Sequence, residues 1–191
     1  SSLAYDGFNA TDYPNVNVNL AGLNPARPGW VGAWFSSTGN FLTQSGGLTY
    51  SDGARDLSTG GNRIGNSANA RSGRLLDTTP TGPFAPWLNN TEIGADGQTL
   101  YFSFLMKLNV HGFNALELHR VNSSDSNRAL YIGSSVNSNA THFFMNAKGS
   151  TAALAPINTT DTQLFVVKVE FGAGTTVGNE RITVWQNPTN Q

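Results

Sequence analysis

Cysteine is absent from this chain of 191 residues. Its absence excludes disulfide bonds, zinc sites built from thiolates and catalysis by a thiol. Charged residues are scarce as well, because Asp, Glu, Lys and Arg together make up 12% of the chain, about half their average share in globular domains. The 11 Lys and Arg residues are scattered and the formal net charge is −1. The sequence therefore offers no basic surface for a nucleic acid.

Long apolar runs are also missing, since none approaches the ~20 residues that a membrane-spanning helix requires. We therefore expect no insertion into a membrane by this chain. Helical periodicity is missing too, because no segment keeps an apolar stripe at a spacing of three to four residues. These absences leave a chain that folds mainly through strands and turns.

Small and neutral polar residues are abundant in this chain, whereas charged residues are scarce. Asn, Gly, Thr and Ser account for 22, 21, 19 and 17 residues; they favour turns and extended backbone and are poor helix formers. Hydrophobic residues at 38% suffice for a core, and the length fits one domain spanning residues 1–191. A neutral polar surface suits extracellular life and contact with sugars, so we expect a secreted or cell-surface protein.

Two segments alternate apolar and polar residues with the period of a half-buried strand. In residues 99–108, Phe102 and Phe104 lie on the predicted core face, and Tyr101 and Lys107 lie on the other. In residues 163–171, Phe165 shares the core face with Val167, Val169 and Phe171. We expect these two segments to form long strands of one sheet-based core.

Shorter strands are expected between clusters of Gly, Asn, Ser and Pro. They are predicted at residues 3–8, 47–50, 73–76, 115–120, 129–133, 141–146 and 181–186. Residues 51–72 and 78–98 are predicted as long loops, of a kind that often serves function. This pattern predicts an all-β fold, an antiparallel β-sandwich of two stacked sheets.

Several short motifs in order resemble a known family. They are AYDGFN (4–9), LAGLN (20–24), GWVGAW (29–34), YFSFL (101–105), RALYIG (128–133), LFVVKVEFG (164–172) and ITVWQNP (182–188). They resemble concanavalin A-like, LamG-type domains of exported bacterial proteins. The resemblance covers most of the chain and implies a jelly roll of two curved antiparallel sheets, exported and often attached to the cell surface.

The chain departs from that family at its end. Such domains continue for several tens of residues beyond the Asn187-Pro188 turn, whereas this chain stops at Gln191. We therefore expect either that the last strands are missing or that a neighbouring copy supplies them. An unpaired sheet edge attracts other strands, so self-association is one expected consequence.

Glycoside hydrolysis is the enzymatic alternative, because laminarinase-type hydrolases resemble this fold. Retaining glycosidases need two carboxyl groups about 5–5.5 Å apart, supplied in that family by a Glu-x-Asp-x-x-Glu motif that this sequence lacks. Glu117 and Glu170 lie on different predicted strands, each near a basic residue, His119 and Lys168. We interpret them as ordinary outer-face charges. No Gly-x-Ser-x-Gly motif marks a serine nucleophile, so we expect a protein that is not an enzyme.

Cofactors are not expected, but binding of a structural Ca²⁺ ion is an alternative. Calcium binds carboxylates and carbonyls in loops, and five aspartates fall in predicted loops or turns: Asp52, Asp56, Asp77, Asp96 and Asp125. The Asp-x-Asx-x-Asx-Gly loop of a calcium-binding hand is missing. The sequence therefore names no metal site.

Aromatic rings are the strongest indication of sugar binding, because a flat exposed ring can stack against the C–H face of a sugar. Trp87, in the proline-rich loop, and Trp185, which alternates with Ile182 and Val184, are the stacking candidates; a core or interface role is their alternative. Trp30 and Trp34 are assigned to the core. The accompanying outer-face candidates are Tyr101, Lys107, Glu117, His119, Lys168 and Glu170.

Three functions follow, in this order. The first is a non-catalytic extracellular module that binds a polysaccharide or a glycoprotein glycan. The second is a structural subunit of a surface layer, fibre or filament that joins neighbouring copies of itself through sheet edges. The third is a glycoside hydrolase. The preference for the first depends on analogy of fold.

Overall fold

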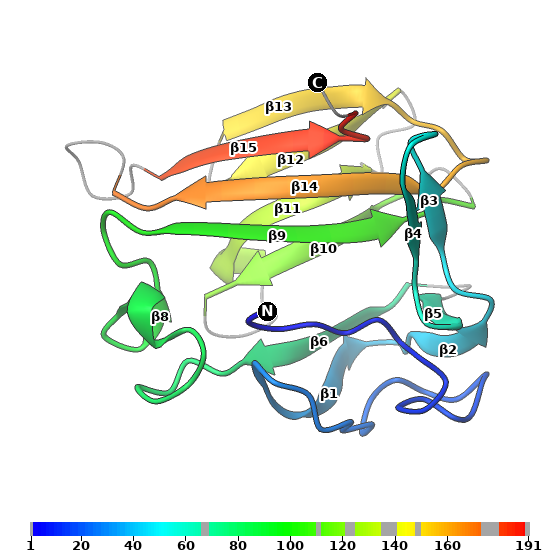
Figure 1. The fold of residues 1–191 in the computed structure, drawn as a ribbon, viewed down its shortest axis with the longest axis horizontal. Helices are drawn as coiled ribbons and strands as arrows, with labels where there is room; N and C mark the ends of the chain where they lie inside the picture. The colour runs from blue at the N-terminus through cyan, green and yellow to red at the C-terminus, as the bar shows by residue number, and fades with distance from the viewer. Residues whose placement is uncertain are drawn as a thin grey trace. The chain divides into compact units, whose positions relative to one another are not determined.

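A computed structural model describes residues 2–65, 69–109, 112–120, 125–134, 141–147, 150–172 and 180–189. The fold is nearly all β, with 51% of residues in strands, 3% in helix and several antiparallel sheets (Figure 1). The all-β antiparallel class predicted from composition and alternation is thereby confirmed.

The described residues form fifteen strands. The first eight are β1 (Trp30–Thr38), β2 (Leu42–Ser45), β3 (Thr49–Ser51), β4 (Asp56–Ser58), β5 (Asn62–Gly65), β6 (Arg71–Leu76), β7 (Leu88–Asn89) and β8 (Glu92–Ile93). The others are β9 (Thr99–Met106), β10 (Asn114–His119), β11 (Arg128–Ser134), β12 (His142–Ala147), β13 (Ser150–Pro156), β14 (Gln163–Glu170) and β15 (Arg181–Gln186). Two short 3₁₀ helices are η1 (Ala85–Trp87) and η2 (Asp125–Asn127).

Two of the sheets have more than two strands. The larger has the order β10-β11-β12-β13, with antiparallel pairing throughout. The smaller has the order β15-β14-β9. Four antiparallel two-stranded ladders complete the set: β1-β6, β2-β5, β3-β4 and β7-β8.

The chain divides into two compact units. Unit 1 comprises Ser1–Tyr101 and Lys168–Thr183, and unit 2 comprises Phe102–Val167 and Val184–Gln191. The division crosses the three-stranded sheet, so that each unit holds part of β9, β14 and β15. The prediction of one domain over residues 1–191 stays a prediction.

The core of unit 1 is organised around a buried tyrosine, Tyr13, which is 1% exposed. Its hydroxyl donates to the Asp6 carboxylate and accepts the indole N–H of Trp34 at 3.0 Å. Arg74 lies 3.7 Å from the same carboxylate, with its side chain 2% exposed. Such polar partners stabilise the fold, because burying a polar group without a hydrogen-bond partner lowers the free energy of unfolding.

The strand predicted at residues 3–8 is wrong, because this segment forms no strand. Phe8 has a φ of 50°, in the left-handed region that extended backbone excludes. The carboxylate of Asp6 accepts the N–H of Phe8 at 3.1 Å, and such local side-chain bonds compete with strand pairing. The apolar residues of this segment belong to a turn that contacts the core, where the ring of Phe8 packs against Tyr13 and Trp34.

The core of unit 2 is built on Phe165, which is fully buried on β14. Phe104 of β9 stacks on its ring at a centroid distance of 5.1 Å, and Phe143 of β12 meets it edge-on at 5.4 Å. Within this unit, therefore, the four-stranded sheet contacts the three-stranded sheet through aromatic rings. Such aromatic pairs add to the free energy gained by burying their area.

Period-two burial holds along most of the two long strands, although Leu164, on the opposite face of β14, is buried as well. Tyr101 and Lys107 are exposed and Leu108 is buried, as the alternation of residues 99–108 predicts. On β14, Phe165 and Val167 are fully buried. The predicted core face is confirmed on both strands.

Candidate functional site

Trp185 is the large aromatic side chain that β15 presents to solvent, with 41% of its surface exposed. The structure confirms the exposure that its alternation with Ile182 and Val184 predicts. Its indole N–H makes no hydrogen bond to any residue in the described part of the chain. The other three indoles donate inside the protein: Trp30 to the Tyr5 carbonyl, Trp34 to the Tyr13 hydroxyl and Trp87 to the Thr99 carbonyl.

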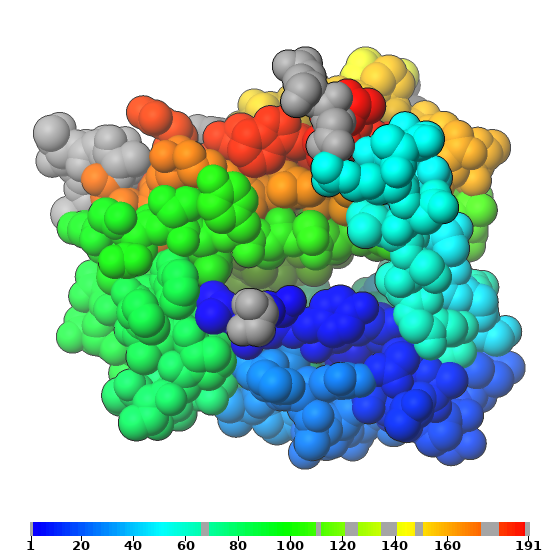
Figure 2. Space-filling model, in the orientation of Figure 1, coloured from blue at the N-terminus to red at the C-terminus, as the bar shows by residue number. Residues whose placement is uncertain are grey.

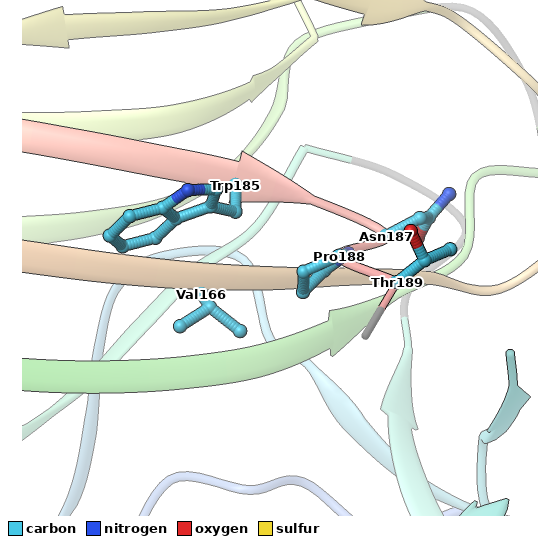
Figure 3. A pocket seen from close by; sticks show the side chains of 5 residues that line it. All are labelled: Val166, Trp185, Asn187, Pro188 and Thr189. Carbon is cyan, nitrogen blue, oxygen red and sulfur yellow. The ribbon is translucent and has the colours of Figure 1, made fainter. Parts of the chain in front are cut away.

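An open depression of about 510 Å³ lies beside Trp185 (Figure 3). The described residues that line it are Val166, Trp185, Asn187, Pro188 and Thr189. Figure 3 shows Val166 projecting from β14 next to the indole, and Pro188 where β15 has ended. In Figure 2, atoms of β14 and β15, in orange and red, reach the surface of the face that Figure 1 presents. Both the indole and the depression belong to unit 2.

Asn187 holds the rim of this depression in place. Its φ of 50° is left-handed, a conformation that asparagine tolerates better than most residues. Its backbone N–H donates to the Leu164 carbonyl at 2.8 Å, and its side-chain oxygen accepts the Leu164 N–H at 2.8 Å. These two bonds extend the pairing with β14 by one residue, so Pro188 and Thr189 leave the strand beside the indole.

Three further amide contacts join the ends of β13, β14 and β15. Gln163, 4% exposed, accepts at Oε1 from Asn187 Nδ2 at 2.6 Å and from Gln186 Nε2 at 3.0 Å. Gln186 in turn accepts the N–H of Ala155 on β13 at 3.1 Å. The network is neutral throughout, and it fixes the rim of the depression through amide groups alone.

Glu117 and His119, two of the predicted outer-face residues, form part of a compact ion cluster. The Glu117 carboxylate contacts His119 Nε2 at 2.9 Å and Arg128 Nη2 at 2.8 Å. The guanidinium of Arg128 lies over the rings of Phe113 and Tyr131, 5.4 Å from each centroid. The side chains of Glu117 and His119 are only 11% and 14% exposed, so this cluster is largely closed to a ligand.

Lys168 and Glu170 pair with each other on β14, with Nζ and Oε1 2.9 Å apart. The hydrogen bond between them raises the pKa of Lys168 and lowers the pKa of Glu170. Tyr101 is 61% exposed in the same unit. Lys107, in unit 2, is exposed just beyond the end of β9.

Trp87, the second stacking candidate, ends the 3₁₀ helix η1 and is half-buried. Its indole donates to the Thr99 carbonyl at 2.8 Å, and its own carbonyl accepts the N–H groups of Gly94 and Ala95. This side chain organises the loop of residues 78–98. Of the two stacking candidates, Trp185 is thus the more exposed, and Trp87 is the one whose indole is bonded inside its unit.

The eight predicted site residues are divided between the units. Unit 1 holds Trp87, Tyr101, Lys168 and Glu170, and unit 2 holds Lys107, Glu117, His119 and Trp185. Four lining residues escaped prediction: Val166, Asn187, Pro188 and Thr189. The Asn-Pro pair after a strand was the available signal, because such pairs mark turns where chain direction changes.

Two of the predicted loop aspartates, Asp52 and Asp77, bind groups of their own loops. Asp52 accepts the N–H groups of Ala54 and Arg55, and these bonds lower its pKa. Asp77 accepts from the backbone and the hydroxyl of Thr79. Among the described residues, no group of three or more His, Asp and Glu side chains lies close enough to hold a metal ion.

The chain gives no match to a protein-family model, to a curated protein or to a solved structure. No helix in the described part of the chain is long and apolar enough to cross a membrane.

Proposed function

We propose that this protein is a non-catalytic, extracellular glycan-binding module. The observation that carries the proposal is Trp185, an exposed indole beside an open depression, whose N–H has no hydrogen-bond partner among the described residues. Polysaccharides and glycoprotein glycans are the ligand classes that such a surface accepts. We further propose a jelly-roll β-sandwich of the concanavalin A-like type, exported by a bacterium, as the sequence resemblance implies.

The indole supplies the two interactions that a sugar needs. Its flat face can stack on the C–H groups of a pyranose ring, and burial of that apolar area is favourable. Its free N–H can donate to a sugar hydroxyl at the ring edge. Binding sites of this kind combine apolar contact area with a few polar groups that orient the ligand.

Contact between sheets supports the proposed sandwich. Phe143 of the four-stranded sheet packs on Phe165 of the three-stranded sheet, and apolar residues alternate with polar ones along β9 and β14. Both features are expected of two sheets that share one core.

A glycan array tests the proposed function, with wild-type protein compared with the Trp185→Ala variant. We expect wild type to bind at least one glycan class and the variant to lose about tenfold in affinity, since roughly 1.5 kcal/mol of apolar burial corresponds to that factor. Tyr5→Ala, which removes another exposed ring outside the predicted site residues, is the matched control and should keep its affinity. An array without any hit for wild type would contradict the proposal.

Strand β13 supports the second candidate function, assembly with neighbouring copies. This strand is the edge of the four-stranded sheet. It carries no charged residue, and residues 151–153, 155 and 156 are exposed. Neutral exposed edges attract further strands. Gln186 opposes such pairing, however, because its side chain already occupies the N–H of Ala155.

Sedimentation velocity distinguishes this second function from the first. If β13 joins copies, wild type forms concentration-dependent polymers and Ala153→Lys, which adds an edge charge, disperses them. If the protein is the proposed glycan-binding module, wild type and variant both sediment as monomers at micromolar concentration.

A further inference from the structure

We infer that the ligand of the Trp185 depression is an uncharged polysaccharide that binds through the interior of its chain. The inference rests on the proposed function and adds the chemical class of the glycan and the way in which it is held. It depends on the juxtaposition of the exposed indole with a lining of neutral residues in an open depression.

The absence of charge among the described lining residues selects against acidic sugars. Val166, Trp185, Asn187, Pro188 and Thr189 carry no charge, and the amides that fix the rim are neutral as well. A uronate or a sulfate placed here would lose water without gaining an Arg or Lys partner, which is unfavourable. Lys168, two residues from Val166 on β14, is already paired with Glu170.

The hydrogen-bonding groups around the indole are few. Both polar ends of the Asn187 side chain are engaged, by Gln163 and by Leu164. The Thr189 hydroxyl and the Trp185 N–H are then the groups best placed to meet sugar hydroxyls. With so few directional bonds, stacking dominates the affinity, and the site should discriminate poorly among neutral hexoses.

The open form of the depression determines how the chain is held. A site that recognises a terminal sugar encloses it, whereas an open surface lets a polymer lie across it. Trp185 is 41% exposed on β15, and the depression beside it is open to solvent. A sugar in the interior of an intact polysaccharide chain can therefore reach the indole, and no free chain end is required.

Affinity electrophoresis in gels containing purified polysaccharides tests the inference. The neutral probes are mixed-linkage β-glucan, glucomannan and arabinoxylan, and the acidic probes are alginate, polygalacturonate and heparin. We expect at least one neutral polymer to retard wild type, with at least tenfold weaker retardation of Trp185→Ala. Trp185→Phe, which keeps a ring, should retain part of the retardation, and Tyr5→Ala, at an exposed ring that is not among the predicted site residues, should retain all of it.

The outcomes separate the inference from the function on which it depends. Retardation by acidic polymers alone, lost in Trp185→Ala, overturns the inference and leaves glycan binding standing. Retardation by no polymer overturns both. Neutral retardation that Trp185→Ala leaves intact overturns the assignment to this depression. A thermal melt of each variant reveals any that lose affinity by unfolding, and Trp185→Phe then decides the case.

Chain length tests the mode of binding. Fractions of one neutral polymer, compared at equal molar concentration of chain ends, should bind more tightly as the chains lengthen, because longer chains offer more internal sites. Affinity that follows the concentration of ends alone would overturn recognition of the chain interior.

Discussion

At the scale of single residues, the buried polar groups of unit 1 are the features most sensitive to change. Tyr13 connects Asp6 and Trp34 through its hydroxyl, and Arg74 approaches the same carboxylate. Burial raises the pKa of Tyr13, and the hydrogen bond to Asp6 raises it further. The folded protein therefore strongly favours the neutral phenol.

Tyr13→Phe should lower the free energy of unfolding at neutral pH by about 1–3 kcal/mol, because it removes the hydroxyl that donates to Oδ2 of the buried Asp6 carboxylate. Urea denaturation followed by fluorescence measures this change. Tyr101→Phe, at an exposed ring, is the control and should be neutral. Equal stability of the two variants would show that the Tyr13 hydroxyl contributes nothing.

The pH dependence follows from the raised pKa of Tyr13. Its contribution to stability is complete below the unfolded value of about 10 and is lost as the pH rises above it. Wild type should therefore lose stability more steeply than Tyr13→Phe above pH 10, by up to about 1.4 kcal/mol per pH unit. Urea denaturation from pH 8 to 11 makes the comparison, and parallel curves would contradict it.

Phe165→Ala should lower the free energy of unfolding by about 3–5 kcal/mol, since it removes a fully buried ring that two other rings contact. Phe113→Ala, at a ring that is 39% exposed, should cost about 1 kcal/mol or less. Thermal unfolding in parallel measures both. Similar losses would mean that unit 2 is not packed around Phe165.

At the scale of elements, the sequence predicted strands best where one face is buried. Residues 163–171 show this, because Phe165, Val167 and Val169 pack inward while their neighbours stay closer to solvent. Strand β15 has the predicted bounds, Arg181–Gln186. Strand β13 was missed because its alanines give no contrast between faces. Register shifts interrupt the alternation of β1, which was also missed.

A close approach of backbones joins β10 to β11. Gly133 lies opposite Ala115, and a Cβ at this position would come within 1.9 Å of the Asn114 carbonyl oxygen. Gly133→Ala should therefore push the strands apart and lower the free energy of unfolding by roughly 1–3 kcal/mol. Gly112→Ala is the control, because its nearest neighbour would be 3.7 Å away. Thermal melts with equal midpoints would contradict the close approach.

At the scale of the whole molecule, composition and alternation predicted the all-β class. Of the residues that line the depression, the sequence predicted Trp185 alone. Alternation predicted that Trp185 is exposed, since this depends on its own strand. The positions of Pro188 and Thr189 depend on bonds from Asn187 to Leu164, which is 23 residues away in sequence. No local pattern encodes such a contact. For the same reason, the partner of Trp87 could not be predicted.

Metal removal should leave the folded molecule unchanged. Asp52 and Asp77 each accept hydrogen bonds from their own loop at Oδ1, and these bonds help to order both segments. We expect the same melting midpoint before and after treatment with EDTA, and no rise when excess Ca²⁺ is added. A fall on EDTA treatment that Ca²⁺ reverses would reveal a structural ion.

The central claim, that Trp185 is the ring on which a neutral glycan stacks, has one most direct measurement. The four tryptophans give four indole N–H signals in a ¹H–¹⁵N NMR spectrum, and Trp185→Phe identifies the signal of Trp185 by its loss. On titration with soluble mixed-linkage β-glucan or glucomannan oligosaccharides, we expect the Trp185 signal to shift and saturate while the other three stay in place. A Trp185 signal that does not move while another indole signal does would contradict the claim.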